Sequence, residues 1–226
     1  MSADAARGPH TLSHRTYQAL RREIATGQIR PGQRLVREEI AQRLGVSHMP
    51  VIEALLRLEQ DGLAESIPNR GSRVKTVSLE TVRNECVLRE AIECQVARLV
   101  AEAAGSQSDR LASAARRLDR LMQRGDSGSE IGMELHMEFH LDLARLTGFE
   151  LLREQLEAVW LRHLMQINWL NAALQPVPAD WHQSLLAALG GGDPDTAERA
   201  MREHVRYGAD HLARAVQELG GADARP

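Results

Sequence analysis

Helical spacing of apolar residues covers most of this chain and is interrupted by strand-like runs only between residues 62 and 78. Before the interruption, the spacing predicts three short helices, over about 13–26, 36–44 and 47–61. After it, six more helices are predicted, near 79–104, 108–124, 129–146, 149–171, 178–190 and 194–217. The breaks between these six are short and rich in Gly, Ser or Pro, which favours an antiparallel helical bundle. The fold class is therefore predicted to be mainly α.

The interruption itself contains two extended runs, 63–67 and 72–77, joined by the turn-forming segment PNRG. This arrangement is typical of a β-hairpin. Three helices followed by a hairpin predict an N-terminal winged helix-turn-helix. The predicted domains are a flexible N-terminal tail at 1–12, a winged helix-turn-helix DNA-binding domain at 13–77, a C-terminal all-α helical bundle for effector binding and dimerisation at 78–218, and a flexible tail at 219–226.

The stretch GVSHMPVIEAL, residues 45–55, has the features of a turn between two helices. Gly45 suits the position after a helix where a left-handed conformation is needed. Ser47 is a residue type that caps helix N-termini through its side chain, so it is predicted to cap the next helix. Pro50 is tolerated in the first turn, because the N–H groups there have no helical partner. The second and third helices therefore form the helix-turn-helix.

The charge is distributed unevenly between the two parts of the chain. The net charge of −3 divides into +4 for residues 1–77 and −7 for the remainder. Hydrophobic residues make up 43% and charged residues 26% of the chain, which is ordinary for a globular protein and argues against disorder. A basic first third on an acidic remainder indicates an anion-binding head on an independent body.

The sequence also restricts the compartment. We find neither an apolar run of membrane-spanning length nor a signal peptide at the N-terminus, so we expect a cytoplasmic protein. Cys86 and Cys94 fall eight residues apart in one predicted helix. At a rise of about 1.5 Å per residue they lie roughly 12 Å apart, too far for a disulfide. Both are expected to be small buried apolar residues in a reduced environment.

The head resembles the DNA-binding domain of the GntR family of bacterial regulators. The resemblance lies in IATGQIRPGQRLVREEIAQRLGVSHMPVIEALLRLEQDGL followed by PNRGSRV, and covers residues 13–77. Its markers are the Gly27 and Pro31-Gly32 turn, the LGVS turn, the Pro50 to Leu55 helix, and Asn69-Arg70-Gly71 in the wing. The resemblance implies binding to double-stranded DNA at a pseudo-palindromic operator.

The start of the third helix is expected to enter the major groove. Relatives in the family usually have arginine at the positions of His48 and Ile52, and neither residue can make the bidentate contact of arginine with guanine. One alternative is that the head has lost DNA binding. The predicted DNA contacts are Ser47, His48, Met49 and Ile52 in this helix, and Arg34, Arg37, Arg57, Arg70 and Arg73 around it.

Four histidines of the body fall on predicted inward faces. His136 and His140 are spaced i, i+4, so they share one face of a helix. His182 and His204 each lie in an apolar stripe of another helix. One interpretation is hydrogen-bonded core histidines; the other is a shared divalent metal ion, which would use nitrogens that are costly to bury unpaired. His163 shows no comparable pattern.

The body resembles the FCD ligand-binding domain of the FadR/VanR-like branch of the GntR family. Its markers include Leu88-Arg89, Glu138-Phe139-His140, Trp181-His182 and His204. In metal-binding members, one Asp and three His hold a divalent ion, and the three His correspond to His140, His182 and His204. His136 stands where those members have Asp. Nitrogen-only ligands favour Zn or Ni. Alternatively, His136 turns away and leaves three ligands.

The resemblance further implies a homodimer whose DNA binding, as a repressor in most members, responds to a small organic acid. Arg89 matches an arginine that anchors the carboxylate of the effector, and the alternative is an ion pair with Glu93. Arg162 and Asn168 are weaker effector candidates. Two rival functions stay open: a regulator without metal, whose histidines line a polar pocket, and a metalloenzyme. Glu138 points away from the histidine face and gives no general base, so we expect no enzyme.

Overall fold

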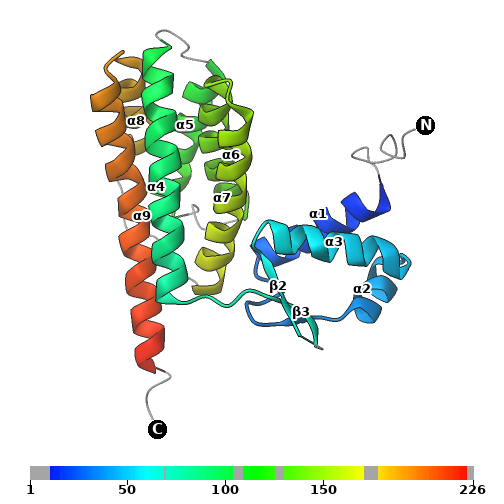
Figure 1. Cartoon of the computed structure of the whole chain (residues 1–226). Helices are drawn as coiled ribbons and strands as arrows, with labels where there is room; N and C mark the ends of the chain where they lie inside the picture. The colour runs from blue at the N-terminus through cyan, green and yellow to red at the C-terminus, as the bar shows by residue number, and fades with distance from the viewer. Residues whose placement is uncertain (1–10, 69, 104–108, 126–129, 171–177, 223–226) are drawn as a thin grey trace, which may run out of the picture. The chain divides into compact units, whose positions relative to one another are not determined.

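The computed structural model describes residues 11–68, 70–103, 109–125, 130–170 and 178–222 (Figure 1). The chain divides into two compact units, Met1–Val77 and Ser78–Pro226, here called the head and the body. The head is three helices with a small sheet, and the body is helical. The prediction of a mainly α fold, with a winged helix-turn-helix followed by a helical domain, is confirmed.

The head is built from six elements. They are α1 (Leu12–Ala25), β1 (Arg34–Leu35), α2 (Arg37–Leu44), α3 (His48–Gln60), β2 (Ala64–Ile67) and β3 (Gly71–Val74). Helix α1 packs against α3, and the side chains of Leu20, Ile24, Val51 and Leu58 are all fully buried between the elements of the head. These residues are the apolar positions at helical spacing, so burial of the stripe explains why each segment is helical.

The turn between α2 and α3 follows the prediction in one respect and departs from it in another. Gly45 ends α2 in the left-handed region, at φ 64°. Ser47 occupies the N-cap position of α3, but its side chain makes no capping hydrogen bond. The prediction that the Ser47 hydroxyl caps this helix is therefore wrong. The hydroxyl is exposed at the start of α3.

The wing contains one strand more than the sequence predicts. The sheet has the antiparallel order β1-β3-β2, with Arg34 opposite Arg73 in one pair and Ala64 opposite Val74 in the other. Strand β1 has two residues, too few to show a period, and only Leu35 of the two is buried. The predicted second strand also ends earlier, at Val74. Asn69, a predicted wing marker, lies outside the described residues.

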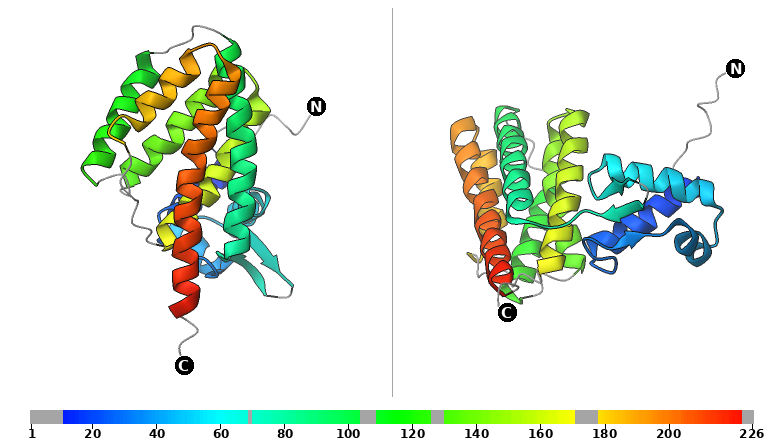
Figure 2. Two further views of the ribbon diagram at one scale, coloured as in Figure 1. Left: turned by 90° about the vertical axis from the view of Figure 1, so that its left-hand side faces the viewer. Right: turned by 60° about the horizontal axis from the view of Figure 1, so that its bottom comes forward.

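The body is formed by α4 (Leu79–Glu102), α5 (Asp109–Gln123), α6 (Glu130–Leu146), α7 (Glu150–Leu170), α8 (Trp181–Gly190) and α9 (Pro194–Ala222). Helices α4 and α9 run side by side in opposite directions (Figures 1 and 2). Helix α4 starts with a capping box formed by Ser78 and Thr81. Helix α9 continues to Ala222, four residues beyond the predicted end of the helical domain at residue 218.

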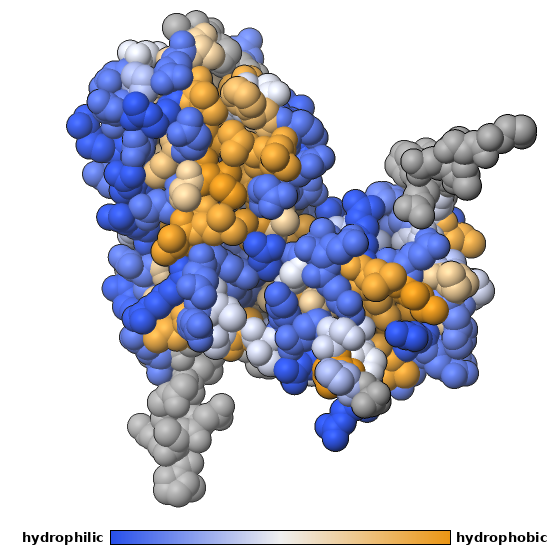
Figure 3. Space-filling model, viewed as in Figure 1, coloured by the Kyte–Doolittle hydropathy of each residue, from blue (hydrophilic) through white to orange (hydrophobic). Residues whose placement is uncertain are grey.

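Apolar surface remains exposed on both units (Figure 3). The exposed large apolar side chains are Leu12, Val36, Met49 and Leu56 in the head and Val87, Leu88, Ile131, Phe149 and Leu151 in the body. Among the described helices, none combines the length and the apolar character needed to cross a membrane. Exposed apolar residues that gather on one face often mark an interaction surface.

Candidate metal centre and nucleic-acid interface

Three helices of the body bring imidazole rings to one point. His136 comes from α6, His182 from α8 and His204 from α9, and their potential ligand nitrogens all lie within 4.8 Å of one another. The ring centroids of His136 and His182 are 4.9 Å apart, and those of His182 and His204 are 5.0 Å apart. We call these three residues the histidine triad. They are separated by up to 68 residues in sequence, and packing of the three helices alone joins them.

His140, the fourth predicted ligand, lies directly beside the triad. Its ring centroid is 5.1 Å from that of His136 and 5.1 Å from that of His204. Its Nδ1 lies against Oε2 of the Glu93 carboxylate on α4. The i, i+4 spacing on α6 therefore places both rings inward as predicted. His136 does not turn away, as one alternative had it, but joins the triad, and His140 lies beside the triad with Glu93 at its Nδ1.

His182 is fixed in orientation by Asp119 of α5. One carboxylate oxygen of Asp119 accepts hydrogen bonds from the His182 backbone N–H (2.9 Å) and from its Nδ1 (2.8 Å). The other oxygen accepts from the backbone and side-chain nitrogens of Gln183. Asp119 thus caps the start of α8, whose own N-cap residue Asp180 makes no capping bond. The proton on Nδ1 leaves Nε2 of His182 as the lone-pair nitrogen.

Glu93 and Arg89 form a buried charged pair next to His140. Arg89 is 4% exposed; its Nε donates to Glu93, its Nη1 donates to Nε2 of His163 at 2.8 Å, and its guanidinium lies 3.9 Å from the ring centroid of Trp160. Burial alone would raise the pKa of Glu93, but Arg89 and the hydrogen-bonded His140 outweigh burial and hold the pKa at about 2. The ion pair considered as the alternative role of Arg89 is therefore present.

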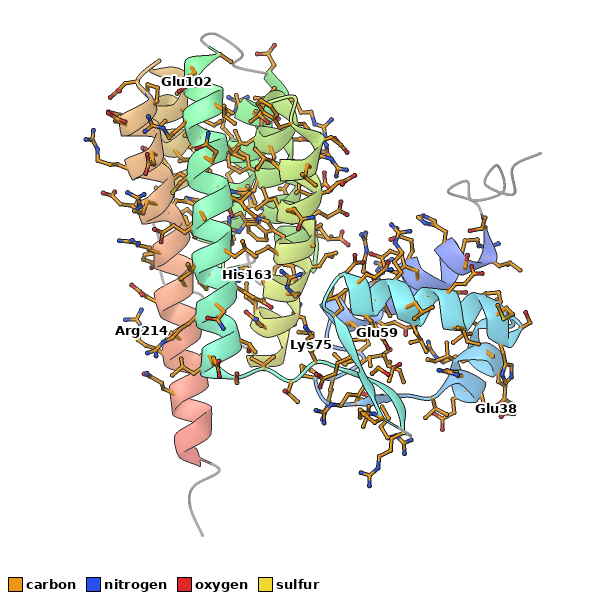
Figure 4. All side chains as sticks on the ribbon, viewed as in Figure 1. Glu38, Glu59, Lys75, Glu102, His163 and Arg214 are labelled. Carbon is orange, nitrogen blue, oxygen red and sulfur yellow. The ribbon has the colours of Figure 1, made fainter. Side chains whose placement is uncertain are left out.

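His163 is a buried residue that the sequence pattern did not single out. It lies on α7, inside the body (Figure 4), and is 5% exposed. Because Arg89 can only donate, His163 accepts with Nε2 and is neutral. Burial and the Arg89 charge lower its pKa well below the ordinary value. The sequence analysis did not predict a role for Asp119 either. A carboxylate on the apolar face of α5, next to the buried Leu118, could have indicated one.

The burial, the missing hydrogen bonds and the protonation of the imidazole nitrogens make the triad suitable for a metal ion. The Nε2 atoms of His136, His140, His182 and His204 are buried, and none has a hydrogen-bond partner among the described residues. Burial lowers the pKa of His136, His140 and His204, so these rings are neutral at pH 7. Unpaired buried nitrogens are costly, and a neutral imidazole is the form that ligates metals. The buried triad can therefore bind a metal ion.

The same lowered pKa values predict a pH dependence for the metal-free protein. The unfolded chain takes up protons on His136, His163 and His204 below about pH 6.5, whereas the folded chain does not. Stability is therefore fully present above that pH and is lost as the pH falls, by up to about 1.4 kcal/mol per pH unit for each histidine.

Urea unfolding with chelator at pH 7.5, 6.5 and 5.5, followed by tryptophan fluorescence, measures this loss. All three tryptophans belong to the body, so the signal excludes the head. Glu93 and Asp119, whose pKa values are lowered, change the stability only at more acidic pH. They therefore do not contribute to the pH dependence between pH 5.5 and 7.5. A midpoint that is constant or higher at pH 5.5 would contradict the assignment of neutral buried imidazoles.

The weaker effector candidates already have protein partners. Arg162 on α7 donates from Nε to Glu85 at 3.0 Å, and the neighbouring Gln166 binds the same carboxylate. The side-chain nitrogen of Asn168 donates to the carbonyl of Leu164 on its own helix. The structure therefore places Arg162 in an ion pair and Asn168 in a local hydrogen bond.

In the head, the predicted DNA contacts on α3 lie together at its exposed start. Ser47, His48 and Met49 are exposed, and Ile52 is half-buried on the following turn. Residues on the opposite side of α3, such as Val51, are buried in the head. The helix therefore turns the predicted contact residues outward as a group.

The predicted arginines differ in how they are held. Arg34 donates to the backbone oxygen of Arg70 at 2.8 Å, and Arg73 pairs with Glu65 at 2.7 Å. Arg57 lies 4.2 Å from the ring centroid of Tyr17, which orders it against α1. Arg37 and Arg70 are exposed and make no ion pair within the part of the head that the structure describes. Exposed arginine side chains such as these are able to contact phosphate groups.

Comparison with known proteins matches both units. Residues 12–74 match the family model "Bacterial regulatory proteins, gntR family", and residues 86–207 match the FCD domain model. The chain is 28% identical over 219 residues to the HTH-type transcriptional repressor RspR of Escherichia coli K12, covering 92% of this chain and 91% of RspR. It is 31% identical over 206 residues to an HTH-type transcriptional regulator of Streptomyces ambofaciens, covering 88% of this chain and 84% of that one.

Solved structures show the same fold. Escherichia coli McbR/YncC superposes with a TM-score of 0.75 at 24% identity, covering 92% of this chain and 99% of McbR/YncC. A GntR-family regulator of Pseudomonas syringae pv. tomato DC3000 superposes with a TM-score of 0.53 at 25% identity, covering 96% and 91%. RspR and the matched gntR family are transcriptional regulators and not enzymes, which confirms the expectation of no enzyme for this chain.

Proposed function

This chain belongs to the GntR family of bacterial regulators, in the branch with a C-terminal FCD domain, and from this premise we propose that it is a metal-dependent, effector-controlled repressor. It is a DNA-binding transcriptional regulator. Repression is proposed because RspR, which resembles it over nearly its whole length, is a repressor. The observation that carries the sensing part is the convergence of unpaired buried imidazole nitrogens in the body.

The repressor is proposed to act as a homodimer that places two heads on a pseudo-palindromic operator. Apolar surface on the body supports an interface there (Figure 3). Val87 and Leu88, at 69% and 45% exposed, show that α4 contributes to this surface. In the head, the exposed start of α3 and the exposed Arg37 and Arg70 are the proposed DNA contacts.

The proposed ligands are the triad together with His140. Two of the four rings have a carboxylate on Nδ1, Asp119 for His182 and Glu93 for His140. Such pairs orient metal-binding histidines and direct Nε2 toward the ion. A set of neutral nitrogens favours Zn or Ni over Mg or Mn. When bound, the ion supplies a centre of positive charge that can coordinate a carboxylate.

A small organic acid is the proposed effector, with Arg89 as the residue that favours its negative charge. Arg89 lies over Trp160, whose ring contacts those of His136 and His140 at 5.0 Å. The guanidinium charge also contributes to the lowered pKa values of His136 and His204, so it acts on the site electrostatically. Arg162 and Asn168 are proposed as outer contacts, which requires that Arg162 share its charge with Glu85.

Metal analysis combined with a carboxylate screen tests this function. Protein purified without a His-tag and without chelator is expected to contain close to one Zn or Ni per chain. Small mono- and dicarboxylates are expected to raise its unfolding temperature only when metal is present, and to weaken its binding to DNA upstream of its own gene. Carboxylate binding without any metal would instead support a polar, histidine-lined pocket.

Asp119→Asn is predicted to weaken metal binding by about 10- to 100-fold, as loss of such orienting carboxylates typically does. The neutral amide accepts the hydrogen bonds from Nδ1 and the backbone N–H of His182 more weakly than the charged carboxylate does. The His182 ring is then held less firmly in its orientation. Competition with a chromogenic chelator measures the affinity. Asp180→Asn, at the N-cap position that makes no capping bond, is the matched control and should leave the affinity unchanged.

A further inference from the structure

The exposed side of α3 carries an apolar stripe where a DNA-reading helix is expected to be polar. Met49 is 61% exposed and Leu56 is 55% exposed, with half-buried Ile52 between them. Their spacing of three and four residues aligns them on one face. The side of the helix that packs into the head is a different one, formed by Val51 and Leu58, both fully buried. The stripe is therefore additional to the core.

The chemistry of this face excludes the usual contact with guanine. Residues 48–55 contain neither Lys nor Arg. Guanine presents two acceptors in the major groove, and arginine or lysine is the side chain that donates to both. Glu53, exposed next to Ile52, is an acceptor when ionised and cannot bond to them. In the major groove, thymine alone presents a methyl group to apolar side chains.

Positive charge remains elsewhere in the head. Arg37 starts α2 and Arg70 lies in the wing, both exposed and without an ion pair in the described part of the head. Phosphate contacts of this kind position a protein on DNA and carry no sequence information directly. The head thus has the means to hold the duplex backbone while α3 offers an apolar surface to the bases.

From this surface we propose that Met49 and Ile52 recognise thymine 5-methyl groups, so that each operator half-site has A·T pairs at the positions under the start of α3. The proposal rests on the DNA-binding function of the head and states which base pairs the head would recognise. Ser47 and His48 supply hydrogen bonds beside the methyl contacts, and Leu56 continues the apolar surface along the helix.

Removal of single methyl groups from the DNA tests the proposal. The operator is first selected from random DNA with the full-length protein. Each thymine is then replaced by deoxyuracil, which pairs identically but lacks the methyl group. Binding measured by fluorescence anisotropy is expected to weaken about fourfold for each contacted thymine, the effect of one buried methyl-sized group. Thymines outside the contacted positions serve as internal controls and should show no change.

Two variants connect the effect to the helix. Ile52→Ala should lose the discrimination between thymine and uracil at one position of each half-site, and Ile52→Arg should shift the selected base there toward guanine. Salt-dependent binding to random DNA shows that each variant is folded. A selected operator that binds equally with thymine or uracil at every position overturns the proposal and leaves DNA binding intact. Failure to select any sequence would overturn specific DNA binding itself.

Discussion

Replacing Glu93 by alanine is expected to lower the free energy of unfolding of the body by about 3–5 kcal/mol. The carboxylate is 1% exposed and is the partner of both Arg89 and His140. Its removal leaves the Arg89 guanidinium, itself 4% exposed, without a counter-charge. A buried charge that loses its partner is among the most destabilising changes a folded protein can suffer.

Urea denaturation followed by tryptophan fluorescence measures this effect in the full-length chain, because Trp160, which lies under Arg89, is part of the signal. Glu90→Ala is the matched control. Glu90 lies on the same helix and pairs with Arg202 and Arg206 at the surface, so its loss should cost no more than about 1 kcal/mol. Similar losses for both variants would show that Glu93 is not the buried counter-charge.

A double variant separates the charge from the packing. Arg89→Met combined with Glu93→Met removes both members of the buried pair and supplies apolar volume in their place. Replacement of a buried ion pair by apolar residues is often neutral or stabilising. The double variant should therefore be more stable than Glu93→Ala alone. If it is less stable, the loss arises from packing around the site, and the unpaired charge is not its cause.

The fold could be predicted from sequence because most of its elements bury one clear apolar stripe. Helix α5 shows why: Leu111, Ala115 and Leu118 recur at helical spacing and are all buried. Strand β1 could not be predicted in this way, since two residues carry no period and its pairing with β3 depends on a turn at Pro31-Gly32. The spacing of apolar residues identifies elements that are long enough for the spacing to recur. Shorter elements form only through their contacts with the rest of the fold.

Of the candidate site, the sequence predicted the inward-facing histidines but not the residues that contact them. The positions of His136, His182 and His204 in apolar stripes indicated burial, and the structure brings the three rings together. Their partners were less accessible, because Asp119 lies 63 residues from His182 and no local spacing connects them. The sequence predicts Glu93 only as a partner of Arg89, because its contact with His140 depends on how α4 packs against α6.

The two carboxylate–histidine pairs have a common physical consequence. Asp119 is on α5 and Glu93 is on α4, yet each binds Nδ1 of a histidine and leaves Nε2 directed away. At His182 the hydrogen bond from Nδ1 to Asp119 selects one tautomer and leaves the lone pair on Nε2. The Nε2 atoms of the three triad histidines and of His140 have no hydrogen-bond partner among the described residues. Their burial costs free energy as long as no ion is bound. In the proposed metal site, His182 would therefore need no change of tautomer to bind an ion.

His204→Ala is expected to abolish tight metal binding and the stabilisation that accompanies it. His204 offers one of the three triad nitrogens, and its ring is stacked on Trp181 at a centroid distance of 4.0 Å. At a free metal concentration 100 times the dissociation constant, a bound ion adds about 2.7 kcal/mol to the stability of the wild-type chain. The variant should show no such increase with Zn or Ni.

The comparison must separate loss of the ligand from loss of stability, because His204→Ala also leaves a cavity beside Trp181. The relevant quantity is therefore the difference in unfolding free energy with and without metal, measured for each variant. His163→Gln is the matched control: His163 is equally buried but bonds to Arg89 outside the triad, so this variant should be destabilised yet keep the metal-dependent increase. Loss of the increase in both variants would mean that it reports general damage to the body, and retention in both would remove His204 from the ligands.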